Sequence, residues 1–208
     1  YNTMFAVGLA FASFSVHAFD NCQAVPAILD QMAKEDQSIR YKADRLKPDD
    51  YSLNPEMARL NLANTTKLKE IVKQCGWPTV EKYGYEPAHN AWLIAQHSDQ
   101  DIQFQIDVRA ILRPLAIKGA ASRKEFAYLS DRIELQKSGK QKYGSQLMFL
   151  ADRVILPPEE IDSIEEVNNR RAEIGLDSIE EYLRQANERQ AKIRNEINAE
   201  TNTKENIR

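Results

Sequence analysis

The chain of 208 residues lacks several features that mark common functional classes. It has no surplus of basic residues, since 28 Lys and Arg stand against 31 Asp and Glu and the formal net charge is −3. Proteins that bind nucleic acid by neutralising phosphates need a basic surface, so we expect no nucleic-acid partner. The sequence also contains no phosphate-binding glycine loop, no His-Glu-x-x-His and no Gly-x-Ser-x-Gly. We therefore predict no cofactor.

Histidine is scarce, which argues against a metal site. Of the three histidines, only His89 and His97 lie beyond the first eighteen residues. On one helix, an eight-residue separation places them about 12 Å apart along the axis, at about 1.5 Å per residue. Two imidazoles at that distance cannot bind one ion together, and we predict no metal.

Residues 1–18 contain no charged side chain, and Met4 to Phe14 is an almost unbroken apolar run. This run is shorter than the roughly 20 residues that a membrane-spanning helix needs. Small residues follow at Val16 and Ala18, where a signal peptidase reads them. We therefore expect residues 1–18 to be a signal peptide, and the mature protein to be periplasmic or secreted without stable membrane insertion. The alternative is a buried apolar helix at the N-terminus.

The chain has two cysteines, Cys22 and Cys75. An even number of cysteines in an exported protein favours pairing, because the compartment is oxidising. We therefore predict a disulfide between Cys22 and Cys75.

Most of the remaining sequence has helical periodicity and helix-capping signals. The fold class is therefore predicted as mainly α, with a single helical domain over residues 19–198 and a disordered tail over 199–208. Residues 139–156 differ, because they carry two glycines and short apolar runs before a double proline. We expect a small β-hairpin or a structured loop there. Helices are expected at 26–45, 54–75, 87–98, 101–117 and 122–136, and again after Ser163 and Ser178.

The first candidate site segment is Gln96-His97-Ser98-Asp99, at the end of an expected helix. His97 has two interpretations. It could end the helix, where the dipole favours a positive side chain, or it could act as a general base oriented by Asp99 or Asp131.

Two further polar segments follow. Asp131 and Arg132 lie next to each other on an expected helix, and Gln141, Tyr143 and Gln146 lie in the glycine-containing segment after it. Amides and hydroxyls in such a loop often only satisfy backbone groups.

These segments occur in an order that resembles a bacterial family, domain of unknown function 6624, over about residues 70–185. The resemblance rests on Gly76-Trp77-Pro78, Gln96 to Asp99, Phe104-Gln105, Tyr128 to Arg132, Gln141 to Gln146 and Arg170 to Leu176. Ser98 and Ser145 stand where alanine and threonine are usual. The family has no assigned activity, so the resemblance implies no catalytic role. It does imply that His97, Gln105, Asp131, Arg132, Gln141, Tyr143 and Gln146 are motif positions, and we expect them to converge in space together with Gln96.

Such a polar set suits either an open ligand site or a buried hydrogen-bond network, and the sequence leaves both open. The first functional hypothesis is a binding module for a polar small molecule or a protein partner. The second is a hydrolase, with His97 as general base, water as nucleophile and Arg132 stabilising negative charge. The third is an immunity or inhibitor protein of the bacterial envelope.

Overall fold

Helices dominate the computed structural model, which describes residues 22–46, 52–150 and 152–205. Within these ranges there are eight α-helices and one antiparallel pair of two-residue strands. The prediction of a mainly α protein with a small hairpin inside residues 139–156 is therefore confirmed. The expected signal peptide, residues 1–18, lies outside the described residues.

The elements follow one another along the chain in this order: a short 3-10 helix (Cys22–Ala24), α1 (Val25–Ala43), α2 (Asn54–Cys75), α3 (Val80–Tyr83), α4 (Tyr85–Gln96), α5 (Ile102–Ile117), α6 (Arg123–Ser138), β1 (Met148–Phe149), β2 (Val154–Ile155), a second 3-10 helix (Pro158–Glu160), α7 (Ile164–Glu173) and α8 (Ile179–Glu205).

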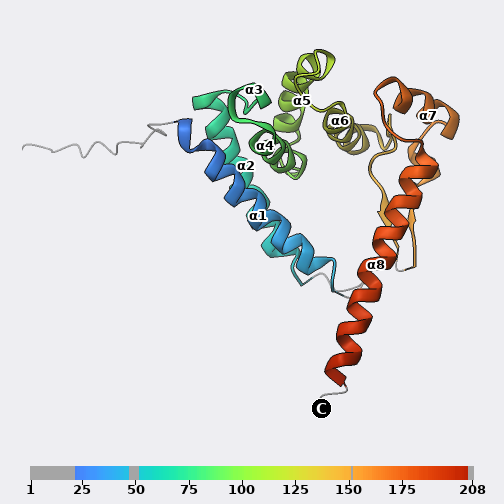
Figure 1. The fold of residues 1–208 in the computed structure, drawn as a ribbon. Coiled ribbons are helices and arrows are strands. Elements are labelled where there is room, and N and C mark those ends of the chain that lie inside the picture. Colours follow the sequence, from blue (N-terminus) through green and yellow to red (C-terminus); the bar gives the residue numbers. More distant parts are fainter. Residues whose placement is uncertain (1–21, 47–51, 151, 206–208) are drawn as a thin grey trace, which may run out of the picture.

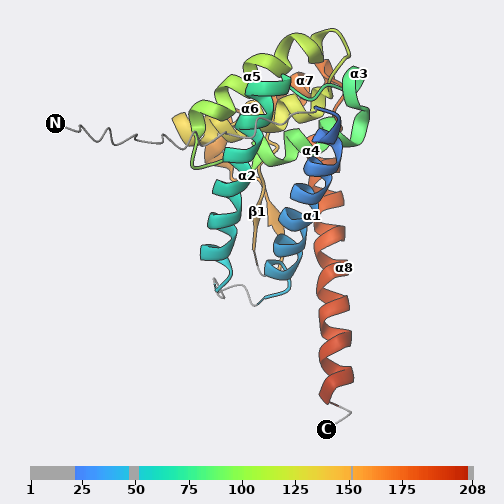
Figure 2. The same cartoon turned by 90° about the vertical axis from the view of Figure 1, so that its left-hand side faces the viewer.

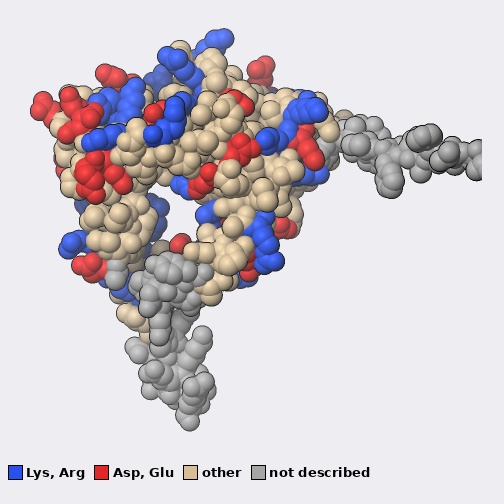
Figure 3. Space-filling model, turned by 180° about the vertical axis from the view of Figure 1, so that it is seen from behind, with Lys and Arg blue, Asp and Glu red and all other residues tan. Residues whose placement is uncertain are grey.

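Helices α3 to α7 form a layer from which two arms extend toward the same side (Figures 1 and 2). The first arm is the antiparallel pair α1 and α2, and the second is α8 with the β1–β2 hairpin beside it. A space-filling view shows an opening through the molecule between the arms, directly below the layer (Figure 3). Residues where the arms meet the layer therefore lie beside this opening.

Several helix boundaries follow from local capping chemistry. The side chains of Asp101, Ser122 and Ser163 accept hydrogen bonds from backbone N–H groups three residues later, at 3.0, 3.2 and 3.2 Å. Each bond satisfies an N–H that has no partner inside its helix. At the other end of α2, Gly76 adopts φ 76°, a conformation that glycine accepts without steric cost.

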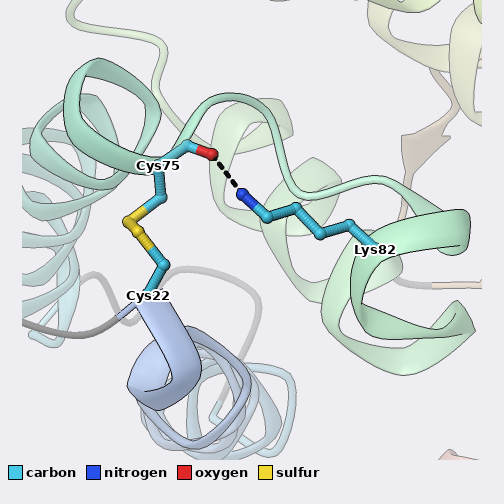
Figure 4. The surroundings of a disulfide bond; sticks show 3 residues. All are labelled: Cys22, Cys75 and Lys82. Atoms are coloured by element: carbon cyan, nitrogen blue, oxygen red, sulfur yellow. Dashed lines mark hydrogen bonds between the residues drawn. A yellow bond between two sulfur atoms is a disulfide. The ribbon is translucent and has the colours of Figure 1, made fainter.

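A disulfide joins Cys22 to Cys75, with an S–S distance of 2.05 Å, as predicted (Figure 4). It connects the start of the first arm to the end of α2. The backbone carbonyl of Cys75 also accepts a hydrogen bond from Nζ of Lys82, at 2.7 Å, which ties α3 to the same point. The disulfide thus joins the two chain ends of the first arm to each other, and the Lys82 bond links them to α3.

The buried apolar side chains of the described residues form two clusters. The main one packs α1, α2, α4, α5 and α6 together around side chains such as Leu29, Leu68, Ile94 and Leu129, each at most 1% exposed. The smaller one joins the loop before α7 to α7 and α8 through Leu156, Ile161, Val167 and Ile179. The second arm therefore has its own small core.

The last helix is longer than the sequence suggested. Helix α8 continues to Glu205, so residues 199–205 are helical where the sequence favoured a disordered tail. Among the described residues, none of the helices combines the length and apolar character needed to span a bilayer.

Candidate functional site

His97 caps the C-terminal end of α4 and contacts the middle of α1. Its Nδ1 lies 2.9 and 3.1 Å from the two carboxylate oxygens of Asp36. Asp36 is fully buried, whereas the His97 side chain is 15% exposed. Because an ionised carboxylate only accepts hydrogen bonds, it holds the proton of a neutral imidazole on Nδ1. The lone pair of Nε2 is then left as an acceptor, and no hydrogen bond joins Nε2 to the described part of the chain.

Asp36 is ionised by its surroundings. Burial raises its pKa, but hydrogen bonds from His97 and Arg40 and the charge of Arg40 outweigh this effect and bring the pKa to about 2. Nε and Nη2 of Arg40 donate to the carboxylate at 3.0 to 3.1 Å, and Nη2 also donates to Asn61 on α2 at 3.0 Å. The carboxylate is thus fixed from two sides.

His97 is neutral near pH 7. Burial lowers its pKa below the ordinary 6.5, the hydrogen bond with Asp36 acts against this, and the charges of Arg40 and Arg132 lower the pKa further. A neutral imidazole with the proton on Nδ1 can accept a proton or a hydrogen bond at Nε2.

The lowered pKa of His97 predicts a pH dependence of stability. Between the lowered value and 6.5 the folded protein binds fewer protons than the unfolded chain, so the free energy of unfolding falls as pH decreases through this window. Asp36 adds a separate decrease in the free energy of unfolding below pH 3.8, as the pH approaches its folded pKa of about 2. Imidazole NMR should show that His97 titrates with a midpoint below 6.5 and that its neutral form carries the proton on Nδ1. A midpoint for His97 at or above 6.5 would contradict the prediction, and His89→Asn distinguishes the two signals.

A second ion pair lies two residues after His97. Asp99 accepts hydrogen bonds from Nε and Nη2 of Arg132, at 2.6 and 2.5 Å, and Nη1 of Arg132 donates to Gln146 at 2.9 Å. Burial raises the pKa of Asp99, but the bond and charge of Arg132 outweigh it, so the pKa lies below its usual value. Side-chain contacts therefore run from α1 through the end of α4 to α6, and from α6 to Gln146 in the segment before the hairpin.

Near the end of α4, two buried side-chain oxygens have no hydrogen-bond donor among the described residues. Nε2 of Gln105 donates to the backbone carbonyls of Ala95 and Gln96 at 3.1 and 3.2 Å and to Asp99 at 3.2 Å. The Oε1 atoms of Gln96 and Gln105 are buried, and neither accepts a hydrogen bond from the described residues. A buried acceptor without a donor costs stability. Nε2 of His97 and these two oxygens are thus three acceptors that have no donor among the described residues.

Asp131 contacts the backbone of the loop that follows α6. It is completely buried and accepts hydrogen bonds from the backbone N–H groups of Lys142, Tyr143 and Ser145 at 2.8, 2.9 and 2.8 Å. Burial raises its pKa, although these N–H groups act in the opposite direction. A raised pKa can mark a catalytic acid, but both oxygens of Asp131 are occupied by loop N–H groups. We therefore assign Asp131 to the folding of loop 142–145.

Loop 142–145 is held from other directions as well. Oε1 and Nε2 of Gln141 bond the backbone N–H and carbonyl of Gln146, both at 2.8 Å. The Tyr143 carbonyl accepts from Nη1 of the buried Arg171 at 2.8 Å. Gly144 has φ 61°, which favours glycine, and a Cβ atom there would lie 2.8 Å from a side-chain carbon of Ile179, so another residue would be strained.

The sequence candidates thus fall into two groups. His97, Gln96, Gln105, Arg132 and Gln146 meet near the end of α4, whereas Asp131, Gln141 and Tyr143 organise the loop.

The carboxylate that contacts His97 is Asp36, rather than Asp99 or Asp131, and sequence reasoning missed it. A signal was present, because Asp36 interrupts the apolar stripe of α1 that includes Met32 and Ile39. An acidic residue in such a stripe is rarely buried unless it is paired.

Comparison with known proteins identifies the family of the chain. The model of a family of unknown function, DUF6624, matches residues 25–193, a longer span than the 70–185 expected and one that includes Asp36. No curated protein and no solved structure matches the chain. Since the match covers well over half of the sequence, the chain belongs to the DUF6624 family.

Proposed function

We propose that the protein binds a polar ligand at the end of α4, through a hydrogen bond donated to Nε2 of His97. The observation that carries this proposal is the Asp36–His97 contact, which orients the imidazole and leaves Nε2 without a partner among the described residues. A protein partner that presents the same groups would satisfy the same site.

The surrounding charges indicate what kind of ligand fits. Asp36 and Asp99 are paired with Arg40 and Arg132, and His97 is neutral, so these five groups carry no net charge. The partly exposed His97 has an acceptor at Nε2 and therefore favours a ligand that presents a hydrogen-bond donor. A neutral or zwitterionic molecule with hydroxyl, amide or amino groups meets both conditions.

The test of this proposal is the variant His97→Asn. Asparagine keeps an N–H near the position of Nδ1, so the contact with Asp36 survives while the Nε2 acceptor is lost. Calorimetric titration with free amino acids and neutral saccharides should detect a ligand for the wild type and about tenfold weaker binding to His97→Asn, the effect of one lost hydrogen bond. His89→Asn, a histidine substitution on the same helix, is the control. Equal affinities of the two variants, or an empty panel, would refute the proposal.

The same contact supports a second candidate function, a hydrolase that adds water across an ester or amide bond. A neutral imidazole oriented by a carboxylate is the arrangement of a general base. Nε2 would take a proton from a water molecule as its oxygen attacks the carbonyl carbon, and would return that proton to the alcohol or amine that leaves as the C–O or C–N bond breaks. Arg132 is a weaker candidate for stabilising the resulting charge, because its guanidinium already bonds Asp99 and Gln146.

Turnover separates the enzyme from the binding module. For a hydrolase, His97→Asn should lower kcat by about a hundredfold or more on a panel of p-nitrophenyl esters and peptides, while His89→Asn leaves it unchanged. Binding without any His97-dependent hydrolysis would leave the binding module as the function.

An oxidising compartment is part of the proposal, and the Cys22–Cys75 disulfide supports it. The hypothesis of an envelope immunity or inhibitor protein rests on the sequence alone and stays a prediction.

A further inference from the structure

A groove of about 930 Å³ lies between α5, α6 and the end of α7. Neither His97 nor any residue that bonds it lines this groove. One wall is a stripe of α5 formed by Ile106, Arg109, Arg113 and Ile117, whose spacing places them on one face of the helix. This groove is therefore separate from the site at the end of α4.

The opposite wall comes from α6 and the segments after it. Arg123, Phe126, Ser130 and Glu134 follow helical spacing along one face of α6. The segment after α6 adds Lys142 and Tyr143, and the end of α7 adds Glu173 and Ile174. Basic side chains gather over this part of the molecule, with acidic ones toward the α7 side (Figure 3).

The groove carries a surplus of positive charge in an otherwise acidic protein. Arg109 is paired with Glu134, at 2.6 Å. The side chains of Arg113 and Arg123 make no ion pair or hydrogen bond with the residues that the structure describes. Nζ of Lys142 lies 5.4 Å from the ring centre of its neighbour Tyr143. Glu173 offsets only part of this charge, which leaves the groove suited to an anion.

Apolar side chains line the same groove. Phe126 and Ile174 are partly buried, Tyr143 is 5% exposed, and Ile117 is 70% exposed at the C-terminal end of α5. A small inorganic anion would leave these surfaces unused. A ligand with both a charged group and an apolar body would use both kinds of wall.

We propose that this groove binds an amphipathic anion, a carboxylate joined to an acyl chain. The volume falls in the range of about 300 to 1,000 Å³ that small-molecule sites occupy. The planar guanidinium groups of Arg113 and Arg123 match a carboxylate in geometry and charge. The apolar side chains of the groove would contact the acyl chain of the ligand.

Octanoate is the probe, and calorimetric titration of the full chain is the measurement. Octanoate should bind at least about tenfold more tightly than either 1-octanol, which lacks the charge, or acetate, which lacks the chain. The double variant Arg113→Gln/Arg123→Gln should weaken octanoate binding by about tenfold or more. The matched control is Lys118→Gln/Lys124→Gln, which removes the same charge from exposed neighbours outside the groove. Ile117→Ser should weaken octanoate binding and leave any acetate binding unchanged.

The proposal is overturned if octanoate does not bind, if acetate or octanol binds equally well, or if both double variants lose the same affinity. His97→Asn should bind octanoate like the wild type, so this groove and the site at the end of α4 are tested independently.

Discussion

Replacing both cysteines with alanine is expected to lower the free energy of unfolding by about 4 kcal/mol. Cys22 and Cys75 are 53 residues apart, and cross-linking them removes much of the conformational freedom of the unfolded first arm. Urea unfolding of the wild type and of Cys22→Ala/Cys75→Ala measures the difference directly.

The wild type in reducing agent is the control, because it should unfold close to the double variant. Thiol titration of the denatured, unreduced wild type should find neither of these cysteines free. Two free thiols, or equal unfolding midpoints with and without reductant, would contradict the expectation.

Asp131→Asn is expected to cost about 3 kcal/mol of stability. The carboxylate accepts three backbone N–H groups of loop 142–145, and an asparagine would turn one acceptor oxygen into an NH₂ group facing those donors. Asp107→Asn is the matched control, since Asp107 is exposed and, among the described residues, its side chain bonds only Gln103 on its own helix. Chemical denaturation should show a change of less than about 0.5 kcal/mol for the control. A similar small change at Asp131 would show that the loop does not depend on its carboxylate.

Helix α6 explains how three consecutive residues serve three parts of the molecule. Ser130 lines the groove, Asp131 holds loop 142–145, and Arg132 pairs with Asp99 near His97. Successive residues on an α-helix point about 100° apart, because a turn takes 3.6 residues. A segment that is continuous in sequence is therefore divided among separate sites in space.

The sequence was sufficient where the physical cause is local or set by composition. Ser122 and Ser163 accept the hydrogen bonds expected of N-cap residues, and Gly76 ends α2. At the start of α2, the sequence Asn54-Pro55 is typical of an N-cap followed by the first helical residue. The structure instead has Asn54 as the first helical residue, and Leu53 takes the capping position without a side-chain bond. The apolar periodicity and the paired cysteines likewise predicted the helical class and the disulfide.

Only the tertiary structure decided which polar groups meet. Asp36 and His97 are 61 residues apart, and their contact exists because α1 packs against the end of α4. The amphipathic groove likewise needs α5, α6 and α7 to lie together, although each contributes only an ordinary mixture of basic and apolar residues. The helical class, the helix starts capped by Ser122 and Ser163, and the disulfide were determined by the sequence itself, because capping and periodicity act within a few residues and two cysteines offer one pairing. The partner of His97 and the groove were decided by packing, because they depend on how distant helix faces fit together.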